Sequence, residues 1–577
     1  MKENTPWAKK NYVQMAEQLL LQSPAAKPAI ADVTKTNEAI AAIECNDSAM
    51  QTTFKGAGDA FTSVFDDKKG VLYNVVYGDK VILPAGNTMK LSAFRAPVDN
   101  DNWARGAWYA NGLYDLRDSV LSRNAQMLED GSMVLQYVVH TQAPFGGKIV
   151  RNEDNTMTIV NNKAPLGENG FSFISNRIWT IYKDGSVELK SSIVGNNSAL
   201  NLARLGYEIQ LPGELKYYHY YGCGPHNNYA DRRSGAFIEQ YDSKVSDQFV
   251  NFPKPQDMAN REDVRWCALT DWSGNGVLFA ATEGMAASAL SWNSVQLAEA
   301  GHPYQLPKSN STYLNLDRKV TGLGGNSCGQ GGPLEKDCVK AGDNMMGFIM
   351  RPVKGAKFTE AANVSSSSIA PIVVVRDRRG KVTMRSDGAG SEIYYKVGTG
   401  RRVKSVKYNE PIDMSKGGVL TVWDKNRPEM TSVYNYSAVT VQPIVVTYAS
   451  SQEIQEAADK LVDGDANTIW HTMYSVTVAQ YPHWIDFDAG EECIVKGFSY
   501  LPRQDGGNNG NIKDYEVSIS SDGKEWKSVK KGAFDGSANI KRVIFDAPVK
   551  MRYIRFTALS SQNGADFAAG AEFELIK

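Results

Sequence analysis

The stretch KDGSVELKSSIV, residues 183–194, decides the fold class of this chain. After its Asp-Gly turn, apolar and polar side chains alternate, which places Val187, Leu189 and Ile193 on one face of an extended segment. Alternation with period two indicates a half-buried β-strand, and Asp-Gly supplies the positive φ that tight hairpins require. This stretch therefore predicts a β-hairpin whose second strand faces a core.

The same pattern recurs along the chain. Tyr515, Val517 and Ile519 alternate in another run. Turn signals separate such runs at Glu129-Asp130-Gly131, Lys183-Asp184-Gly185, Arg379-Gly380 and Ser521-Asp522-Gly523. No series of strands alternating with amphipathic helices is found, so the sequence predicts an all-β protein and does not predict a (β/α)₈ barrel.

The composition is that of a globular protein with several domains. A chain of 577 residues is too long for one core. Its 63 basic and 64 acidic residues leave no excess of positive charge for nucleic acid. No apolar run is long enough to span a membrane, and the lysine-containing start lacks the apolar segment of a secretory signal.

The six cysteines are scattered and form no C-x-x-C motif, so neither a zinc knuckle nor a thioredoxin-like site is indicated. Cys328 and Cys338 flank a Gly-rich segment and could form a disulfide. Unpaired thiols are the alternative that we favour.

Composition also suggests the domain boundaries. A prefix ends in an Ala-rich stretch, and a Ser- and Ala-rich segment follows a long β region. We expect units at residues 1–51, 52–353, 369–445 and 446–577, with a linker at 354–368.

The long β region resembles the last domain of family 2 β-galactosidases, a large β-sandwich of the galactose-mutarotase-like type. Four stretches carry the resemblance: FRAPVDNDNW (94–103), YYGCGPHNNYADRRSGAF (220–237), FPKPQDMANREDVRW (252–266) and LNLDRKVTGLGGNSCG (314–329). The prefix, with TPWAKKNYVQMAEQ, is similar to the final strands of the immunoglobulin-like domain that precedes this sandwich in the family.

The resemblance implies that the chemistry belongs to a barrel upstream of these residues. Two carboxylates about 5–5.5 Å apart would act there in a retaining mechanism. In this chain Asp99 and Asp101 are the candidates for such a carboxylate pair, but we expect them to cap turns and to bind backbone amides. In some family members an aromatic residue of a loop follows a Gly-Gly turn and lies near the sugar. The corresponding segment here contains no Trp: Gly324-Gly325-Asn326-Ser327-Cys328-Gly329.

Two smaller units follow the sandwich. The spacer at 369–445 resembles fibronectin-III-like modules of secreted glycosidases, through SEIYYKVGTG and the run from Gly418 to Trp423. Residues 446–577 resemble the discoidin, or factor V/VIII type C, fold, which in bacterial glycosidases is the family 32 carbohydrate-binding module. LVDGDANTIWHTMY (461–474), HWIDFDAG (483–490), YLPRQDGGNNGNIKDYEVSIS (500–520) and MRYIRF (551–556) carry this match, which implies a jelly roll with ligand loops at one end.

The terminal module contains the residue types that a sugar site needs. A sugar ring packs its C–H groups on an aromatic face, and charged or amide groups bind its hydroxyls. The resemblance implies that galactose-type sugars bind through Glu453, His471, Tyr474, Arg503, Asn509 and Phe567. A surface histidine with no ligand is the alternative for His471 taken alone.

A second implied site lies in the same module. The segment from Val462 to Thr468, with Asp463, Asp465 and Thr468, resembles the calcium loop of this fold, and Glu572 completes the candidate ligands. Hard oxygen ligands on a tight turn suit Ca²⁺. An Asp-Gly turn without a metal is the alternative.

These observations together predict a non-catalytic C-terminal region of a β-galactosidase-type glycosidase with a galactose-binding module, a structural Ca²⁺ and galactose-containing glycans as partners. The catalytic portion of the same enzyme is a further expected partner, and the family resemblance implies a periplasmic or extracellular parent enzyme. The rival hypothesis is a free-standing carbohydrate-binding or adhesion protein. A third, that the sandwich carries out its own sugar chemistry, would require His226 with an acidic partner.

Overall fold

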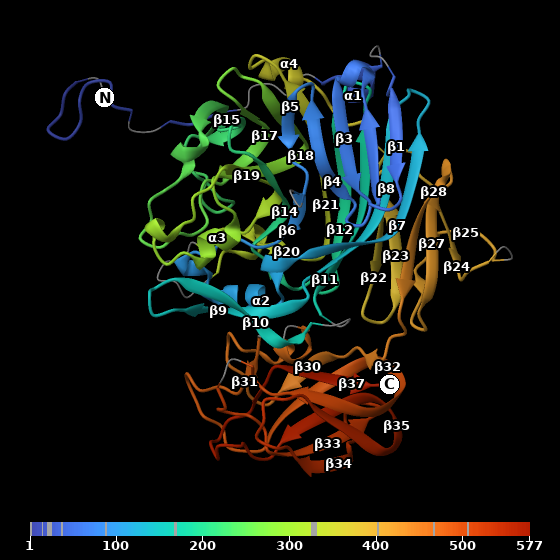
Figure 1. Ribbon diagram of the computed structural model, residues 1–577. Coiled ribbons are helices and arrows are strands. Elements are labelled where there is room, and N and C mark those ends of the chain that lie inside the picture. The colour runs from blue at the N-terminus through green and yellow to red at the C-terminus, as the bar shows by residue number, and fades with distance from the viewer. Residues whose placement is uncertain are drawn as a thin grey trace.

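The computed structural model describes residues 3–13, 16–19, 26–35, 39–86, 89–166, 170–324, 332–367, 369–400, 403–464, 468–504 and 507–577. Figure 1 shows a large β body, a small β unit at its side and a terminal module below them. Strands dominate every part, which confirms the predicted all-β class. Four short α-helices occur among the described residues: α1 (Ile30–Thr34), α2 (Arg105–Ala110), α3 (Ser294–Glu299) and α4 (Phe358–Ala362).

One layer of the large body is a five-stranded antiparallel sheet in sequential order. Its strands are β1 (Ala42–Asn46), β2 (Gln51–Lys55), β3 (Phe61–Asp66), β4 (Val71–Tyr77) and β5 (Lys80–Leu83). The sandwich thus begins before the expected boundary at residue 52, because β1 pairs with β2 along its whole length. β1 is an edge strand with no buried side chain, so it lacks the apolar alternation by which a strand is recognised.

The other layer is a twelve-stranded antiparallel sheet with β16 and β7 at the two ends of its main path. Its strands are β6 (Met89–Ser92), β7 (Arg117–Met127), β8 (Met133–Gln142), β11 (Ser172–Ile181), β12 (Val187–Gly195), β14 (Arg204–Pro212), β15 (Tyr217–Gly224), β16 (Phe237–Lys244), β17 (Arg261–Thr270), β18 (Gly276–Leu290), β19 (Ser311–Val320) and β21 (Asp343–Val353). Two short pairs flank it: β9 (Phe145–Arg151) with β10 (Met157–Pro165), and β13 (Asn201–Leu202) with β20 (Val339–Lys340).

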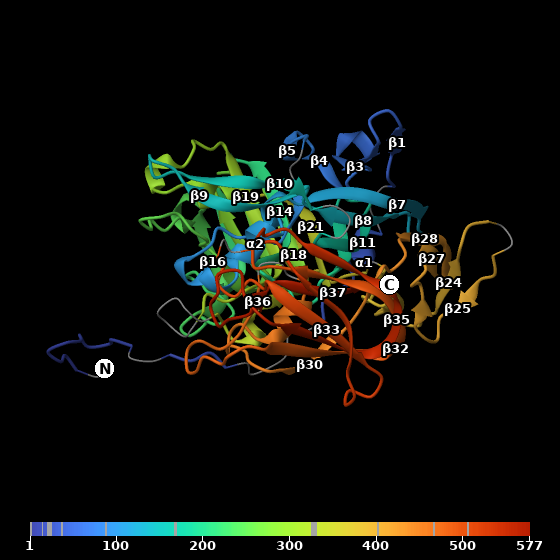
Figure 2. The same cartoon turned by 90° about the horizontal axis from the view of Figure 1, so that it is seen from below.

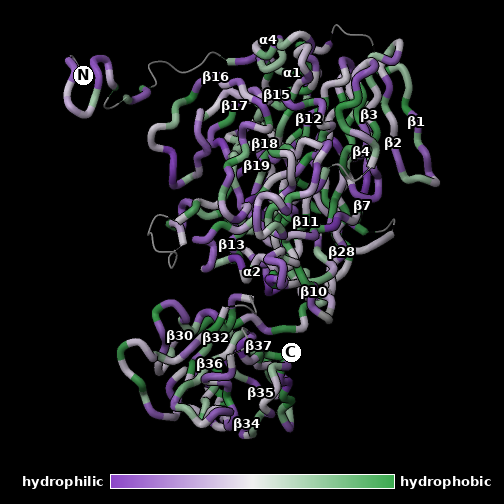
Figure 3. Tube along the Cα trace, turned by 60° about the vertical axis from the view of Figure 1, so that its left-hand side comes forward, coloured by the Kyte–Doolittle hydropathy of each residue, from purple (hydrophilic) through white to green (hydrophobic). Residues whose placement is uncertain are grey.

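The core lies between these two layers. Phe65 of the small sheet meets Trp179 of the large sheet with ring centroids 5.5 Å apart, and both side chains are fully buried. Val187, Leu189 and Ile193 are also fully buried, which confirms the face predicted from the alternation. Figure 3 shows hydrophobic segments concentrated along the strands of this body.

The turns predicted from Gly are confirmed. Gly131, Gly185, Gly380 and Gly523 all have φ between 74° and 84°, and each lies between two consecutive strands. The left-handed region is open to Gly without steric cost, so these four positions could be read from the sequence.

The prefix differs from the expectation. Its described residues before β1 contain no strand; the single regular element there is α1, and Ile30 of that helix is fully buried against the large body. Upstream, the Gln18 side chain pairs with Ile238 on β16, its Nε2 donating to the carbonyl (3.0 Å) and its Oε1 accepting from the amide (2.7 Å). Among the described residues of the prefix, Gln18 and Ile30 thus contact the sandwich.

The expected linker at 354–368 is also structured. Helix α4 buries Phe358 against the ring of Trp266, with centroids 5.5 Å apart, and the same cluster contains Ile30. Composition suggested a loose connection because Ser and Ala are frequent in loops, but the apolar residues of α4 dock on the sandwich.

The spacer is a small sandwich of two sheets. Its strands are β22 (Ile372–Arg376), β23 (Lys381–Ser386), β24 (Ile393–Val397), β25 (Val406–Lys407), β26 (Ile412–Asp413), β27 (Gly418–Asp424) and β28 (Arg427–Tyr436). It packs against the large body: the amides of Gln136 and Asn176 donate to the buried Ser432 hydroxyl at 2.8 and 3.1 Å. Along the edge of β7, the Ser122 hydroxyl accepts from the Val433 amide at 3.2 Å.

The terminal module is a separate β-sandwich with its own core, and Figure 2, seen from below, brings its strands to the front. Its strands are β29 (Val441–Gln442), β30 (Val445–Ala449), β31 (Trp470–His471), β32 (His483–Leu501), β33 (Asp514–Ser520), β34 (Lys527–Ala533), β35 (Lys541–Ala558), β36 (Ala569–Gly570) and β37 (Glu572–Ile576). Tyr515 and Val517 lie in its core and Ile519 packs against that core, as their alternation predicts. No helix among the described residues is long and apolar enough to cross a membrane.

Candidate functional site

Hydrogen bonds join the loops at one end of the terminal module. The short strands β31 and β36 pair, so that His471 lies opposite Ala569. The Ala569 amide also donates to the Gly510 carbonyl at 2.7 Å, and the Thr472 amide donates to the Ala568 carbonyl at 2.9 Å. Three loops that are distant in sequence therefore meet at His471.

His471 lies at the centre of an aromatic group. Its ring centroid is 5.1 Å from that of Tyr474 in an edge-on arrangement and 5.4 Å from that of Phe567. The His471 side chain is buried, whereas Tyr474 is half exposed. His471 Nδ1 lies 2.6 Å from the Thr472 carbonyl. A carbonyl can only accept, so Nδ1 carries a proton and Nε2 of the neutral ring is the acceptor.

Glu453 orients the loop that carries Tyr474. Its carboxylate accepts hydrogen bonds from the amides of Tyr474 and Ser475, both at 3.1 Å, and from the Ser475 hydroxyl at 2.8 Å. The bond from the Tyr474 amide and the other donors lower the pKa of Glu453 to about 2. These contacts give Glu453 a positioning role for the loop of Tyr474, and direct contact with a sugar stays a prediction.

Arg503 and Asn509 lie on the neighbouring loop. Arg503 Nη1 donates to the Asn509 carbonyl at 3.0 Å, and Asn509 Oδ1 accepts from Asn563 Nδ2 at 3.1 Å. The Arg503 guanidinium is close enough to Tyr474 to oppose the rise that burial causes in the pKa of that phenol. The structure therefore brings together the six residues predicted for the site, with the Glu453 carboxylate bonded to the loop that carries Tyr474.

Two residues of this site were not identified from the sequence. Glu456 lies beside Tyr474, where the two side chains share a hydrogen bond, and its Oε2 is buried without a partner among the described residues. Asn563 supports Asn509. Neither belongs to a recognisable motif, since Glu456 sits in an irregular loop and Asn563 in a turn that any polar residue could form.

Asp463 and Glu572 form the second candidate site. The Thr468 hydroxyl donates to Asp463 Oδ2 at 2.8 Å, and Lys460 Nζ lies 3.8 Å from the same oxygen. Glu572 Oε1 is buried and lacks a partner among the described residues. Burial, followed by the nearby Asp463 carboxylate, raises the pKa of Glu572 to about 9.

This donor set fits a hard cation. An orphaned buried carboxylate oxygen, a second carboxylate and a hydroxyl are the oxygen ligands that Ca²⁺ prefers. Asp465, the remaining predicted ligand, lies outside the described residues. Within the described ranges, no cluster of three or more His, Cys, Asp or Glu side chains is found.

The acidic pair in the sandwich has a structural role. Asp101 is fully buried and binds Arg95 through both carboxylate oxygens, Oδ2 to Nε at 3.1 Å and Oδ1 to Nη2 at 2.6 Å. Its Oδ2 also accepts from the Val98 amide at 2.9 Å, which confirms that this residue binds a backbone amide. Asp99 is exposed, so the two carboxylates do not converge on a common site.

The histidine of the third hypothesis is also exposed. For His226, no carboxylate partner is found in the part of the chain that the structure describes. The Cys338 thiol donates to the Leu334 carbonyl at 3.5 Å and is free, while Cys328 and most of the Gly324–Gly329 stretch lie outside the described residues.

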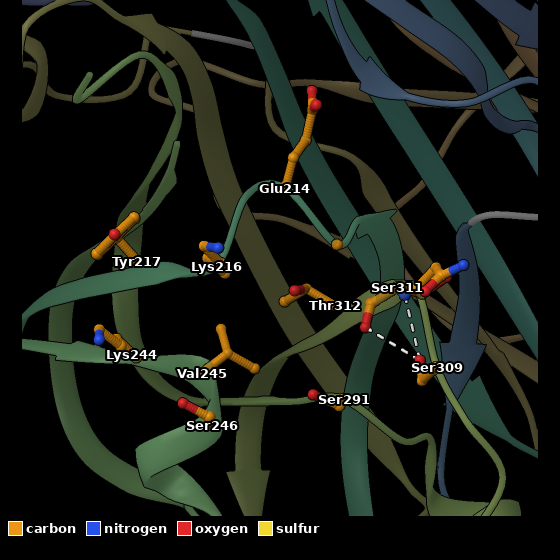
Figure 4. Close-up of a pocket in the computed structure, with 12 residues that line it drawn as sticks. Glu214, Lys216, Tyr217, Lys244, Val245, Ser246, Ser291, Ser309, Ser311 and Thr312 are labelled. Carbon is orange, nitrogen blue, oxygen red and sulfur yellow. Dashed lines mark hydrogen bonds between the residues drawn. The ribbon is translucent and has the colours of Figure 1, made fainter. Parts of the chain in front are cut away.

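A polar cavity of about 540 Å³ opens in the large body between the start of β15, the end of β16 and the segment before β19. Figure 4 shows lysines and hydroxyl side chains around it, with Ser309 and Ser311 hydrogen-bonded to each other. Glu214 is the single carboxylate of its lining and pairs with Lys80 at 2.8 Å.

The fold and the loops thus define a two-layer β-sandwich protein that carries a jelly-roll module with an aromatic and basic site at one end. Comparison with known families agrees with this division. Residues 57–350, about half of the chain, match the family described as beta galactosidase small chain, and residues 446–573 match the F5/8 type C domain. The chain belongs to the beta galactosidase small chain family.

Individual relatives share parts of this arrangement. A beta-galactosidase of Priestia megaterium is 25% identical over 330 residues, which are 57% of this chain and 28% of that protein. A galactose oxidase of Gibberella zeae is 35% identical over 143 residues, 24% of this chain and 21% of that protein. Among solved structures, a family 32 carbohydrate-binding module of Clostridium perfringens NanJ in complex with galactose is 29% identical, with a TM-score of 0.22, covering 24% of this chain and 98% of that one. The chain spans between 18% and 28% of the length of the first three curated relatives, all beta-galactosidases.

Proposed function

We propose that this chain is a non-catalytic accessory region of a β-galactosidase-type glycoside hydrolase, in which the sandwich completes the enzyme scaffold and the terminal module binds galactose-type sugars. The family of residues 57–350 and the beta-galactosidase relatives support the first part. The enzyme's catalytic portion and galactose-containing glycans are the corresponding partners. A periplasmic or extracellular location of the parent enzyme belongs to the same proposal.

The observation that carries the sugar-binding part is the convergence of two aromatic rings, a buried imidazole and a guanidinium at one end of the terminal module. Phe567 and Tyr474 flank His471. An aromatic face packs against the C–H side of a galactose ring, because that side of the sugar is apolar. Arg503 supplies charged donors and His471 Nε2 an acceptor, which suits the hydroxyls at the opposite side of the ring. The resemblance of part of this chain to a protein described as a galactose oxidase supports galactose as the sugar in this proposal.

The affinity follows from the size of the site. A surface that holds one sugar ring buries little area, so we expect a dissociation constant near the millimolar range, about −4 kcal/mol. Replacement of Arg503 by Ala removes hydrogen bonds from a charged group and should cost about 1.5–3 kcal/mol. That loss is most of the binding free energy. Phe567→Ala should cost less, since only stacking is lost.

The test is a titration of galactose, N-acetylgalactosamine and glucose into the wild type, Arg503→Ala and Phe567→Ala, followed by calorimetry or chemical shifts. Arg542→Ala is the matched control, because this exposed arginine of β35 lies outside the site. Galactose should bind more tightly than glucose if His471 and Arg503 read the axial 4-hydroxyl. Equal binding by wild type and Arg503→Ala, or no response to any of the three sugars, would refute the assignment.

We propose also that Asp463, Asp465, Thr468 and Glu572 hold a structural Ca²⁺ in this module. The unpartnered Oε1 of Glu572 and the hydrogen bond between the Glu572 and Asp463 side chains support the assignment, because both carboxyl groups lie within reach of one ion. When bound, the ion would neutralise these charges and fix the loop between β30 and β31.

A further inference from the structure

One sheet of the spacer, formed by β25, β24, β27 and β28, carries a pair of aromatic rings on its outward face. Tyr394 on β24 lies directly opposite Trp423 on β27. Their rings stack with centroids 6.4 Å apart and an angle of 28° between the ring planes, and both side chains are half-buried. The adjacent residues Ile393 and Val422 are buried in the core of the spacer. Because side chains alternate along a strand, the aromatic pair points away from that core.

A cavity of about 690 Å³ opens over these rings. Lys396 and Thr421, which lie opposite each other one step further along the same two strands, also line it. Thr431 of β28 and Lys425 of the turn after β27 lie at its other side. Figures 1 and 2 both show β24 and β25 on the side of the spacer that is remote from β7. The volume is in the range of sites that hold small organic ligands.

The charge around the rings is positive. Among the described residues that line the cavity, two are lysines and none is a carboxylate. Glu392 at its border accepts from Lys407 Nζ at 2.7 Å and from Lys425 Nζ at 3.2 Å, so one carboxylate serves two ammonium groups. Within the described ranges, no carboxylate pairs with Lys396. The cavity is therefore complementary to a ligand that carries negative charge.

We propose that this face of the spacer is a second carbohydrate-binding site and that its ligand is an acidic oligosaccharide. The apolar C–H side of a sugar ring would pack on Tyr394 and Trp423. The Lys396 ammonium would donate to the carboxylate of a uronic acid, and the threonine hydroxyls of the lining suit sugar hydroxyls. Two sites on one chain raise the apparent affinity for a polysaccharide surface that carries both kinds of sugar. The inference does not depend on the galactose site of the terminal module.

The test uses the full chain with the Arg503→Ala substitution, which weakens the site proposed in the terminal module. The probes are cellotetraose and the derivative in which each C6 hydroxymethyl group is oxidised to a carboxylate, so the two differ only in charge and neither contains galactose. Calorimetric titration at low ionic strength should give about threefold tighter binding of the acidic sugar, a factor typical of a partly exposed ion pair. High salt should reduce this preference, because it screens the charge of Lys396.

Two variants in the same background locate the site. Trp423→Ala should weaken the binding of both sugars by about fivefold, since stacking is lost. Its matched control is Trp272→Ala, because Trp272 is 85% exposed and lies outside the cavity. Lys396→Gln should abolish the preference for the acidic sugar and leave the affinity for cellotetraose within about twofold. Its control is Lys416→Gln, an exposed lysine of the spacer outside the lining, and this pair decides even where Trp423→Ala fails to fold.

Four results would overturn the proposal. These are no binding of either sugar, equal binding by Trp423→Ala and Trp272→Ala, equal or tighter binding of the neutral sugar, and an unchanged preference in Lys396→Gln. A polyglutamate peptide that binds as tightly as the acidic sugar would show recognition of charge alone and would overturn the assignment to a glycan. The galactose titration of the terminal module is a separate measurement, so the two proposals succeed or fail independently.

Discussion

Replacement of Asp101 by Asn tests the buried ion pair that ties the PVDNDN segment to the sandwich. Arg95 and Asp101 are both fully buried, and Arg95 also donates to the carbonyls of Thr321 and Gly322 on the segment after β19. An Asn amide retains one acceptor oxygen but directs its NH₂ group at a guanidinium that can only donate. The variant therefore leaves the Arg95 charge buried without its counter-ion.

The cost follows from that uncompensated charge. Breaking a buried ion pair by removing one partner costs about 3–5 kcal/mol. For a domain of this size, 1 kcal/mol lowers the melting temperature by about 2 °C, so the sandwich transition should fall by about 6–10 °C. Scanning calorimetry of the full chain measures it, with the transition of the terminal module as internal reference.

Asp99→Asn is the matched control, because it makes the same chemical change at an exposed residue two positions away. Exposed substitutions usually change stability by less than about 0.5 kcal/mol. If Asp101→Asn were as harmless as Asp99→Asn, the reasoning from burial and charge would be wrong.

Three further outcomes are expected. Ca²⁺ at a hundredfold excess over its dissociation constant should stabilise the terminal module by about 2.7 kcal/mol, which raises its melting temperature by about 10 °C. The Glu572→Gln variant should not show this shift. Identical melting temperatures of the wild type in EDTA and in millimolar Ca²⁺ would contradict the prediction. The chain alone should not turn over a chromogenic galactoside, with a full-length family enzyme as positive control, and activity that survives further purification would disprove the accessory role. Burial raises the pKa of Asp317 to about 7. The folded protein thus binds the proton of Asp317 more tightly than the unfolded chain does. The stability that this proton contributes is therefore lost as pH rises from about 4 to 7. Asp317→Asn should stabilise the sandwich more at pH 8 than at pH 5, and an equal effect at both pH values would count against a protonated Asp317.

The class of the fold could be predicted because alternation and turns leave local marks in the sequence, whereas the role of the six site residues in sugar binding stays a prediction. Alternation predicted the buried face of Val187 and Leu189, and Asp-Gly pairs predicted hairpin turns such as that at Gly185. The six sugar-site residues were named from a resemblance, and the folded loops bring them together. The role of Glu453 could not be predicted, because a carboxylate that binds sugar and one that binds the amides of Tyr474 and Ser475 look identical in sequence.

Features that depend on contacts between distant segments could not be predicted. β1 has no buried side chain, so pairing with β2, rather than its own pattern, makes it a strand. Helix α4 looked like a linker because its partner Trp266 is far away in the chain. Glu456 gave no signal, since its significance lies in one buried oxygen beside Tyr474.

The pairing of Gln18 with Ile238 has a consequence for how this protein behaves among copies of itself. A primary amide offers one N–H and one C=O in the same plane, so the Gln18 side chain copies the peptide group of an added strand. It occupies a pair of the hydrogen-bonding positions that β16 would otherwise present to another molecule, and unprotected edges invite strand-to-strand association. At the opposite end of the sheet the spacer lies against β7, where the Ser122 hydroxyl accepts a hydrogen bond from the Val433 amide. A sheet of twelve strands is thereby covered at both ends by its own chain, the prefix on one side and the spacer on the other.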